Sequence, residues 1–128
     1  MAEPVRVLVV EDCRDTAVSQ ALLLEMAGYE VRLVHDGPAA FREAATFRPD
    51  AVLLDINLPG MDGYQVAEQI RRKPALRRVR LIAVTGYGQA KDIRRGREAG
   101  FDHYLIKPAD PEELLRLLAA EPPAAGNP

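Results

Sequence analysis

The sequence predicts an α/β domain in which a doubly wound parallel sheet is covered by helices on both faces. The chain alternates five short apolar runs with segments whose apolar positions recur at helical spacing. This alternation favours strand–helix–strand units, which place a parallel sheet between two layers of helices. The four residues before Asp55 (AVLL) are all apolar, which is typical of a strand that is buried on both faces.

Five segments are expected to form the strands of this sheet. They are Val5–Val10, Glu30–His35, Ala51–Asp55, Arg80–Thr85 and Asp102–Ile106. The β-branched run Val5–Val10 is expected at the centre of the sheet. In Glu30–His35, Val31 and Leu33 place apolar side chains on one side only, which favours an edge position.

Helices are expected between these strands and after the last one. The first helix begins at Asp15 or Thr16. The other four cover Ala39–Phe47, Tyr64–Arg72, Gln89–Glu98 and Pro111–Ala120. Gly28 and Gly100 stand where two of them should end. Asp62 and Asp110 are good N-caps for the helices that follow them. The residues expected to face the core are Ala17, Ala21, Leu22 and Met26 in the first helix, Val66, Ala67 and Ile70 in the third, and Leu114, Leu115, Leu117 and Leu118 in the last.

Composition indicates a single soluble domain in a reducing compartment. The chain has 128 residues, a formal net charge of −2 and one cysteine, Cys13, so an internal disulfide framework is excluded. No apolar stretch approaches the roughly 20 residues of a membrane span, and we expect a cytoplasmic location. Residues 1–120 are expected to form the domain and residues 121–128, rich in Pro and Ala, a flexible tail.

Four of the five expected strands are followed by, or end on, a chemically useful side chain. These groups are Glu11 and Asp12, Asp55, Thr85 and Lys107. In a parallel sheet they meet at one edge, where ligands bind. Each carboxylate pair at about 4 Å would repel by about 1–4 kcal/mol, which a hard divalent cation such as Mg²⁺ offsets. A hydroxyl and an ammonium beside that cation suit a phosphoryl group.

The motifs VLVVED, LLDINLPGMDG, the TG of VTGYG, and YLIKP occur in the order found in one family. The chain resembles the receiver domain of bacterial two-component response regulators over about residues 5–120. The resemblance implies a CheY-like, flavodoxin-like (βα)5 fold with strand order 2-1-3-4-5. It places the site at the switch point between the first and third strands.

The resemblance also implies a role for each group at the site. Asp55 would be phosphorylated. Mg²⁺ or Mn²⁺ would be bound by Glu11, Asp12, Asp55 and the backbone carbonyl of Asn57. Thr85, Gly86 and Lys107 would contact the phosphoryl group, the Lys107–Pro108 peptide would be cis, and Thr85 and Tyr104 would form a switch that changes the surface of the fourth helix, fifth strand and fifth helix.

Partners follow from the same resemblance. The donor would be a histidine kinase or a histidine phosphotransfer domain, and the downstream partner is an unknown protein. No direct contact with nucleic acid or membrane is expected. The motif style is closest to receivers associated with hybrid histidine kinases, although Cys13 stands where that subgroup often has Asn. This difference bears on the lifetime of the phosphoryl group.

Two other classes of function stay open at this point. A degenerate receiver would keep the fold as a binding module without phosphorylation. A metal-dependent phosphatase of the haloacid-dehalogenase type would use a strand-end aspartate with a second one two residues on. Asn57 stands at that second position and cannot protonate a leaving group, so repeated turnover is not expected. An EF-hand is excluded because Pro59 and Val66 stand where oxygen ligands are required.

The remaining ionisable residues are interpreted as structural or solvated. His35 and His103 show no metal-ligand spacing and are expected on the surface, and Cys13 is expected to be passive. A basic segment lacks interleaved aromatic residues and is interpreted as a solvated face. Its members are Arg71, Arg72, Lys73, Arg77, Arg78 and Arg80.

Overall fold

In the computed structural model, which describes residues 5–58, 60–86 and 90–119, five strands form one parallel sheet. The strand order β2-β1-β3-β4-β5 confirms the predicted topology. The strands are β1 Arg6–Val10, β2 Glu30–Val34, β3 Ala51–Asp55, β4 Arg80–Thr85 and β5 His103–Ile106. The edge position of Glu30–Val34 is confirmed, and so is the interior position of Arg6–Val10.

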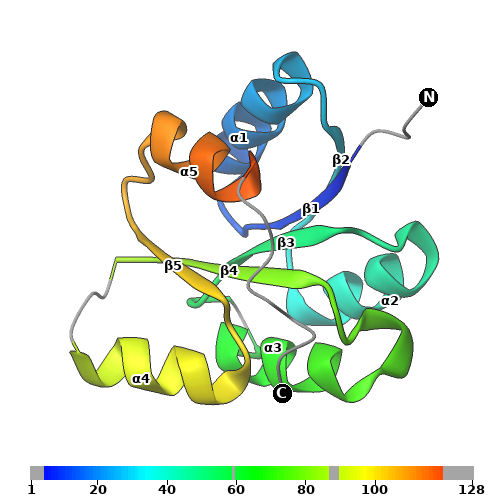
Figure 1. Ribbon diagram of the computed structural model, residues 1–128, viewed down its shortest axis with the longest axis vertical. Helices are drawn as coiled ribbons and strands as arrows, with labels where there is room; N and C mark the ends of the chain where they lie inside the picture. The colour runs from blue at the N-terminus through cyan, green and yellow to red at the C-terminus, as the bar shows by residue number, and fades with distance from the viewer. Residues whose placement is uncertain (1–4, 59, 87–89, 120–128) are drawn as a thin grey trace.

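The helices lie in two layers on opposite faces of the sheet (Figure 1). One layer holds α1 (Arg14–Met26) and α5 (Pro111–Ala119). The other holds α2 (Gly37–Phe47), α3 (Gly63–Arg72) and α4 (Ala90–Ala99), with a short 3₁₀ turn at Pro74–Leu76 after α3. Within the described ranges, no helix combines the length and apolar character needed to cross a membrane.

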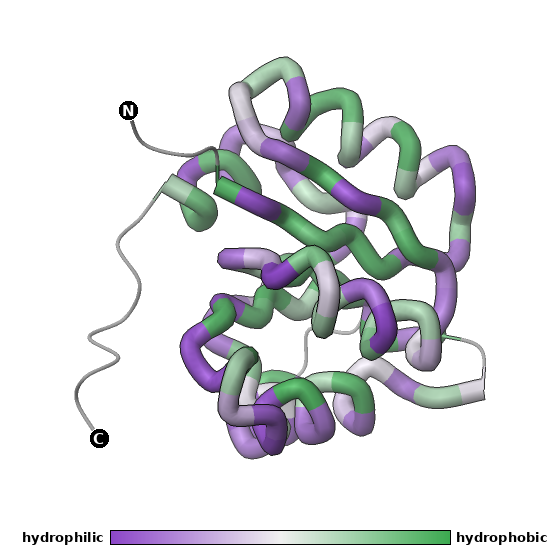
Figure 2. The backbone as a smooth tube through the Cα atoms, turned by 90° about the vertical axis from the view of Figure 1, so that its right-hand side faces the viewer, coloured by the Kyte–Doolittle hydropathy of each residue, from purple (hydrophilic) through white to green (hydrophobic). Residues whose placement is uncertain are grey.

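Alternating residues of the strands feed two separate hydrophobic cores. Leu8, Val52 and Leu81 pack under α2, α3 and α4, whereas Val9 and Leu53 pack toward α1 and α5. Figure 2 shows a nearly continuous hydrophobic run along β1, the strand next to the N-terminus, and mixed hydrophobic and hydrophilic positions along the helices and the edge strand β2. A continuous hydrophobic run is expected of an interior strand that is buried on both faces.

Two strands, Ala51–Asp55 and Arg80–Thr85, have the predicted bounds. The other strands and the helices differ by one or two residues at one or both ends, and the 3₁₀ turn at Pro74–Leu76 was not predicted. The earlier start of α2 has a clear cause. The Asp36 carboxylate accepts the Ala39 amide at 2.8 Å and caps the helix, so Gly37 and Pro38 already belong to its first turn. Gln89, Ala120 and the expected tail at residues 121–128 lie outside the described residues.

The predicted inner face of α1 is partly wrong. Ala17 and Ala21 are buried, but Leu22 is 55% exposed and Met26 is 87% exposed. Leu24, three residues after Ala21, takes the inward position, and residue 22 lies about 100° away from residue 21 around the helix. In α5, Leu114 and Leu118 are buried, while Leu115 and Leu117 are half-buried against the same core.

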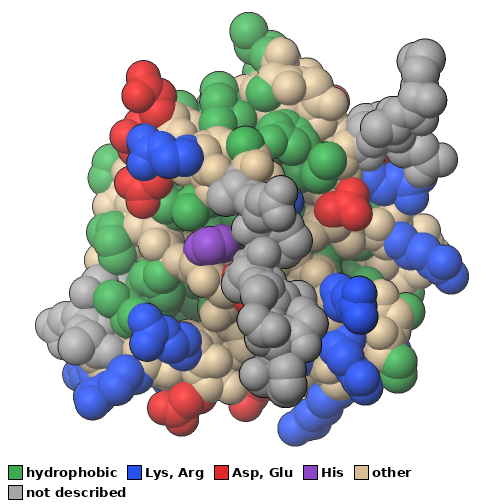
Figure 3. All heavy atoms as spheres, in the orientation of Figure 1, with side chains coloured by type: hydrophobic (Ala, Val, Ile, Leu, Met, Phe, Trp, Pro, Cys, Tyr) green, Lys and Arg blue, Asp and Glu red, His purple; other side chains and the backbone are tan. Residues whose placement is uncertain are grey.

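Arg71 is not part of a solvated basic face, which corrects the sequence interpretation. Its guanidinium donates to the backbone carbonyls of Gly100, Arg77 and Val79, at distances from 2.6 to 3.0 Å. It also pairs with the Asp102 carboxylate at 2.8 Å. The residue therefore connects the end of α3 to the segments that lead into β4 and β5. Figure 3 shows other Lys and Arg side chains on the surface of this part of the molecule.

Candidate functional site

The parallel register brings the predicted site residues together at one edge of the sheet. Val10 pairs with Leu54, Asp55 with Val84, and Thr85 with Ile106. The side chains that follow are therefore neighbours although they are distant in sequence. Glu11 and Asp55 are each only 2% exposed and Thr85 is fully buried, whereas Asp12 is exposed.

The three carboxylates form a cluster that could hold a cation. One oxygen each from Glu11, Asp12 and Asp55 lies within 4.8 Å of the others. In the octahedral shell of one Mg²⁺, oxygens on opposite sides are about 4.2 Å apart and adjacent oxygens about 3.0 Å apart, so the three carboxylates would move closer together on binding the ion. The donor set consists of oxygen atoms, which Mg²⁺ prefers. The residues present therefore fit the predicted ion.

Lys107 lies between two of these carboxylates. Its Nζ is 3.0 Å from Asp55 Oδ2 and 3.2 Å from Glu11 Oε1. Burial lowers the pKa of Lys107, but the hydrogen bonds and charges of Asp55 and Glu11 outweigh burial and raise that pKa above its ordinary value. Burial also raises the pKa of Glu11, and the neighbouring Asp55 adds to this shift. The ammonium thus offsets part of the repulsion between the carboxylates.

Backbone hydrogen bonds hold the Asp55 side chain and the main chain at Lys107. The Asn57 amide donates to Asp55 Oδ1 at 3.0 Å, which leaves Asp55 held by a donor at each oxygen. The Lys107 amide donates to the Thr85 carbonyl at 2.7 Å, and the Lys107–Pro108 peptide is cis. The carbonyl of Asn57 stays a predicted ligand.

Gly63 allows α3 to begin directly against the end of β3. A Cβ at this position would lie 2.7 Å from the Asp55 carbonyl oxygen and 2.7 Å from Ile56 Cα, so a side chain there would displace the backbone. The Gly63 amide donates to the Ile56 carbonyl at 2.8 Å. Asp62 and Gln65 form a capping box at the same helix start. The loop that carries Asp55 is therefore closely packed.

Residues around Glu11 include two that the sequence interpretation treated as passive. The Cys13 amide donates to Glu11 Oε2 at 3.1 Å, while its thiol is exposed and accepts from the Thr16 hydroxyl at 3.3 Å. This hydrogen bond lowers the pKa of the Cys13 thiol. His35 is half-buried and contacts the Glu11 carbonyl at 2.9 Å, a structural contact that the sequence interpretation did not predict for a surface residue. One signal in the sequence could have indicated this contact: His35 is a polar residue at the end of a strand that lies beside the strand leading to Glu11.

Tyr104 lies on the α4 side of the sheet, as strand alternation predicts. Its ring packs against the larger core, and a Cβ at Gly96 would be 3.1 Å from Tyr104 Cε2. Burial raises the pKa of Tyr104 well above its ordinary value, with a further rise from Tyr64, while a hydrogen bond with Thr85 acts in the opposite direction. The hydroxyl therefore lies close to both Thr85 and Tyr64, and Tyr64 in turn donates to the Asp92 carbonyl of α4 at 3.3 Å.

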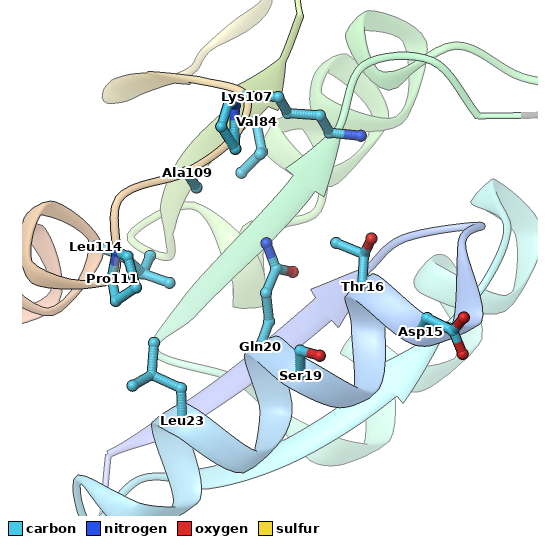
Figure 4. Close-up of a pocket in the computed structure, with 11 residues that line it drawn as sticks. Asp15, Thr16, Ser19, Gln20, Leu23, Val84, Lys107, Ala109, Pro111 and Leu114 are labelled. Atoms are coloured by element: carbon cyan, nitrogen blue, oxygen red, sulfur yellow. The ribbon is translucent and has the colours of Figure 1, made fainter.

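A groove of about 660 Å³ opens beside Lys107 between α1 and α5. Figure 4 shows Thr16, Ser19 and Gln20 on the α1 wall, opposite Ala109 and the start of α5. Lys107 lines this groove, but none of the three carboxylates does, so the groove adjoins the site rather than containing it.

Comparison with known proteins identifies the family. The family model of the response regulator receiver domain matches residues 7–119. The chain belongs to this family of signalling domains in two-component systems. The transcriptional regulator RpaA of Synechocystis sp. is 37% identical over 117 residues, which cover 90% of this chain and 48% of that protein. The chain thus spans about half the length of the curated relatives it matches.

Solved structures agree with this assignment. The chemotaxis response regulator CheY4 of Vibrio cholerae has a TM-score of 0.86 at 28% identity, and the match covers 91% of this chain and 97% of that one. The receiver domain of a sensor histidine kinase from Pseudomonas aeruginosa has a TM-score of 0.83 at 38% identity, covering 91% and 95%. That structure contains a magnesium ion in its active site cleft. The association with hybrid kinases stays a prediction, since the curated relatives are response regulators.

Proposed function

We propose that this receiver accepts a phosphoryl group on Asp55 in a reaction that depends on Mg²⁺ or Mn²⁺. The observation that carries the proposal is the position of Asp55. Its carboxylate is 2% exposed, lies 3.0 Å from Lys107 Nζ, and shares a cluster with Glu11 and Asp12. A structural aspartate would not require two further carboxylates beside it, because their mutual repulsion costs stability.

In the proposed reaction the donor is a phosphohistidine of a histidine kinase or phosphotransfer domain. An Asp55 oxygen forms a bond to phosphorus while the P–N bond breaks, and the imidazole nitrogen keeps that electron pair. Glu11, Asp12, Asp55 and the Asn57 carbonyl would hold the metal ion, which would supply positive charge to the phosphoryl oxygens. Lys107, the Thr85 hydroxyl and the Gly86 amide would donate to the same oxygens.

The protein acts as an acceptor rather than a turnover enzyme in this proposal. Asn57 stands two residues after Asp55, and an amide cannot serve as the general acid that repeated hydrolysis requires. A cytoplasmic location and the lack of direct nucleic-acid contact stay predictions. RpaA is described as a DNA-binding regulator, but the match covers only 48% of that protein.

The test is incubation of the full chain with a small-molecule phosphodonor, with and without Mg²⁺. We expect one acid-stable, base-labile phosphoryl group per chain, located on the peptide that contains Asp55, and none without a divalent ion. Inorganic phosphate released over many turnovers would instead indicate a phosphatase. No uptake in the presence of Mg²⁺ would indicate a degenerate receiver.

Replacing Asp12 with Ala should separate metal binding from folding. The change removes one carboxylate from the cluster, so the metal-free variant should melt at the parent temperature or above it. At 100 times its dissociation constant, Mg²⁺ should stabilise the parent by about 2.7 kcal/mol, and this gain should disappear in Asp12→Ala. Thermal unfolding with and without Mg²⁺ measures both effects.

Asp15→Ala is a matched control for that experiment, because Asp15 is exposed and lies outside the carboxylate cluster. It should keep the full response to Mg²⁺. A variant lacking Asp12 that Mg²⁺ stabilises as much as the parent would show that the cation binds elsewhere.

Phosphorylation is proposed to act on the surface of α4, β5 and α5 through Thr85 and Tyr104. If the Thr85 hydroxyl moves toward a phosphoryl oxygen, it changes the hydrogen bond that it shares with Tyr104. The ring packs against Gly96 of α4, so its shift would alter α4. A beryllofluoride phosphoryl mimic should therefore change amide NMR shifts over α4 and β5 in the parent, and much less in Tyr104→Ala. Changes confined to the strand ends in the parent would contradict this route.

A further inference from the structure

His35 is placed to hold the backbone between the two acidic residues that follow β1. It comes directly after β2 and is half-buried, and its Nδ1 lies 2.9 Å from the backbone oxygen of Glu11. A carbonyl oxygen can only accept a hydrogen bond, so Nδ1 must carry a proton and donate. The hydrogen bond therefore has one direction, from His35 to Glu11.

This hydrogen bond extends the pairing of two strands beyond their ends. The ladder between β1 and β2 ends with Val10 opposite Val34, and the Glu11 amide then donates to the Val34 carbonyl at 3.1 Å. A further bond would require a donor for the Glu11 carbonyl, and the His35 ring supplies it. Both backbone groups of Glu11 are thus held by consecutive residues of the neighbouring chain segment.

The orientation of the Glu11 carbonyl matters because it belongs to the peptide unit that leads into Asp12. That unit is planar, so a donor on its oxygen limits rotation of the whole plane and hence the direction in which Asp12 leaves β1. The Glu11 carboxylate is already held, by the Cys13 amide at 3.1 Å and by Lys107 at 3.2 Å. For exposed Asp12, the structure gives no comparable side-chain contact among the described residues.

We propose that His35 is a positioning residue for the cation site, acting through the Glu11–Asp12 peptide. It does not touch the ion; it keeps the Asp12 carboxylate where a divalent cation can bind it together with Glu11 and Asp55. The inference rests on the proposed function in one respect, that the carboxylate cluster binds Mg²⁺. Groups that orient metal ligands typically change metal affinity by about 10-fold or more when they are removed.

The experiment compares His35→Ala with His35→Asn in the full chain. The Asn side-chain NH₂ can occupy the place of Nδ1 and donate the same hydrogen bond, whereas Ala cannot. We expect the Mg²⁺ dissociation constant, measured by calorimetric titration, to rise about tenfold in His35→Ala and to return close to the parent value in His35→Asn. The Asp12 amide NMR shift, recorded without metal, should follow the same pattern.

His103→Ala provides a control at the other histidine, which pairs with Ile82 far from the cluster, and it should bind Mg²⁺ like the parent. Parent-like affinity in His35→Ala would overturn the proposal. So would an equal loss in the Ala and Asn variants, because the hydrogen bond would then not be the cause. Failure of the parent itself to bind Mg²⁺ would overturn the cation site of the proposed function, and this inference with it.

Discussion

Asp55→Asn should abolish phosphoryl uptake from a small-molecule donor, reducing the rate at least about a thousandfold, which corresponds to roughly 4 kcal/mol of activation free energy. The amide oxygen of Asn carries no formal charge and is a poor nucleophile toward phosphorus. Its amide nitrogen also cannot bind a cation. Mass spectrometry of the intact chain after incubation with donor and Mg²⁺ measures the loss.

The loss should not come from unfolding. An Asn side-chain oxygen can still accept the hydrogen bond that the Asn57 amide now donates to Asp55 Oδ1. Lys107 keeps Glu11 as a partner at 3.2 Å. The metal-free variant should therefore melt within a few degrees of the parent. Asp15→Asn, at an exposed position, should take up phosphoryl at the parent rate. Uptake at that same rate by Asp55→Asn would show that another residue is the acceptor.

Arg71→Ala should have the largest effect on stability among single changes at the basic residues, about 2–4 kcal/mol. The guanidinium donates to three backbone carbonyls and pairs with Asp102, whose side chain is 25% exposed. Truncation leaves these acceptors without their donor and opens a space beside Gly100, where a Cβ would lie 2.7 Å from Arg71 Cγ. Chemical denaturation followed by circular dichroism gives the free energy of unfolding.

Two further variants test whether the geometry or the charge of the Arg71 side chain is responsible for the expected loss of stability. Arg72→Ala, at the exposed neighbouring position, should change the free energy of unfolding by less than about 0.5 kcal/mol. Arg71→Lys keeps the charge but loses the planar fork that reaches several carbonyls at once, so it should recover only part of the loss. Equal stability of the parent and Arg71→Ala would contradict the bridging role.

The strands and the polar or charged residues at their carboxyl ends were predictable, because both depend on short-range sequence patterns. Ala51–Asp55 and Arg80–Thr85 are apolar runs bounded by turn residues or charges, and the structure has both with the predicted bounds. Once the strands are parallel, their carboxyl ends must lie at one edge of the sheet. For this reason the meeting of Glu11, Asp55 and Lys107 could be predicted without coordinates, although their distances could not.

Other features depend on partners that are distant in sequence, and only the tertiary structure decided them. In α1, a run of apolar residues permits more than one inward face, and packing against the sheet buries Leu24 while Leu22 and Met26 stay exposed. Arg71 has its main acceptor 29 residues away and His35 contacts a carbonyl 24 residues away. Local patterns indicate burial and secondary structure, but the partner of a polar side chain is set by how whole segments pack together. The residues at the strand ends that form the site could therefore be predicted from the sequence, whereas the long-range contacts of Arg71 and His35 could not.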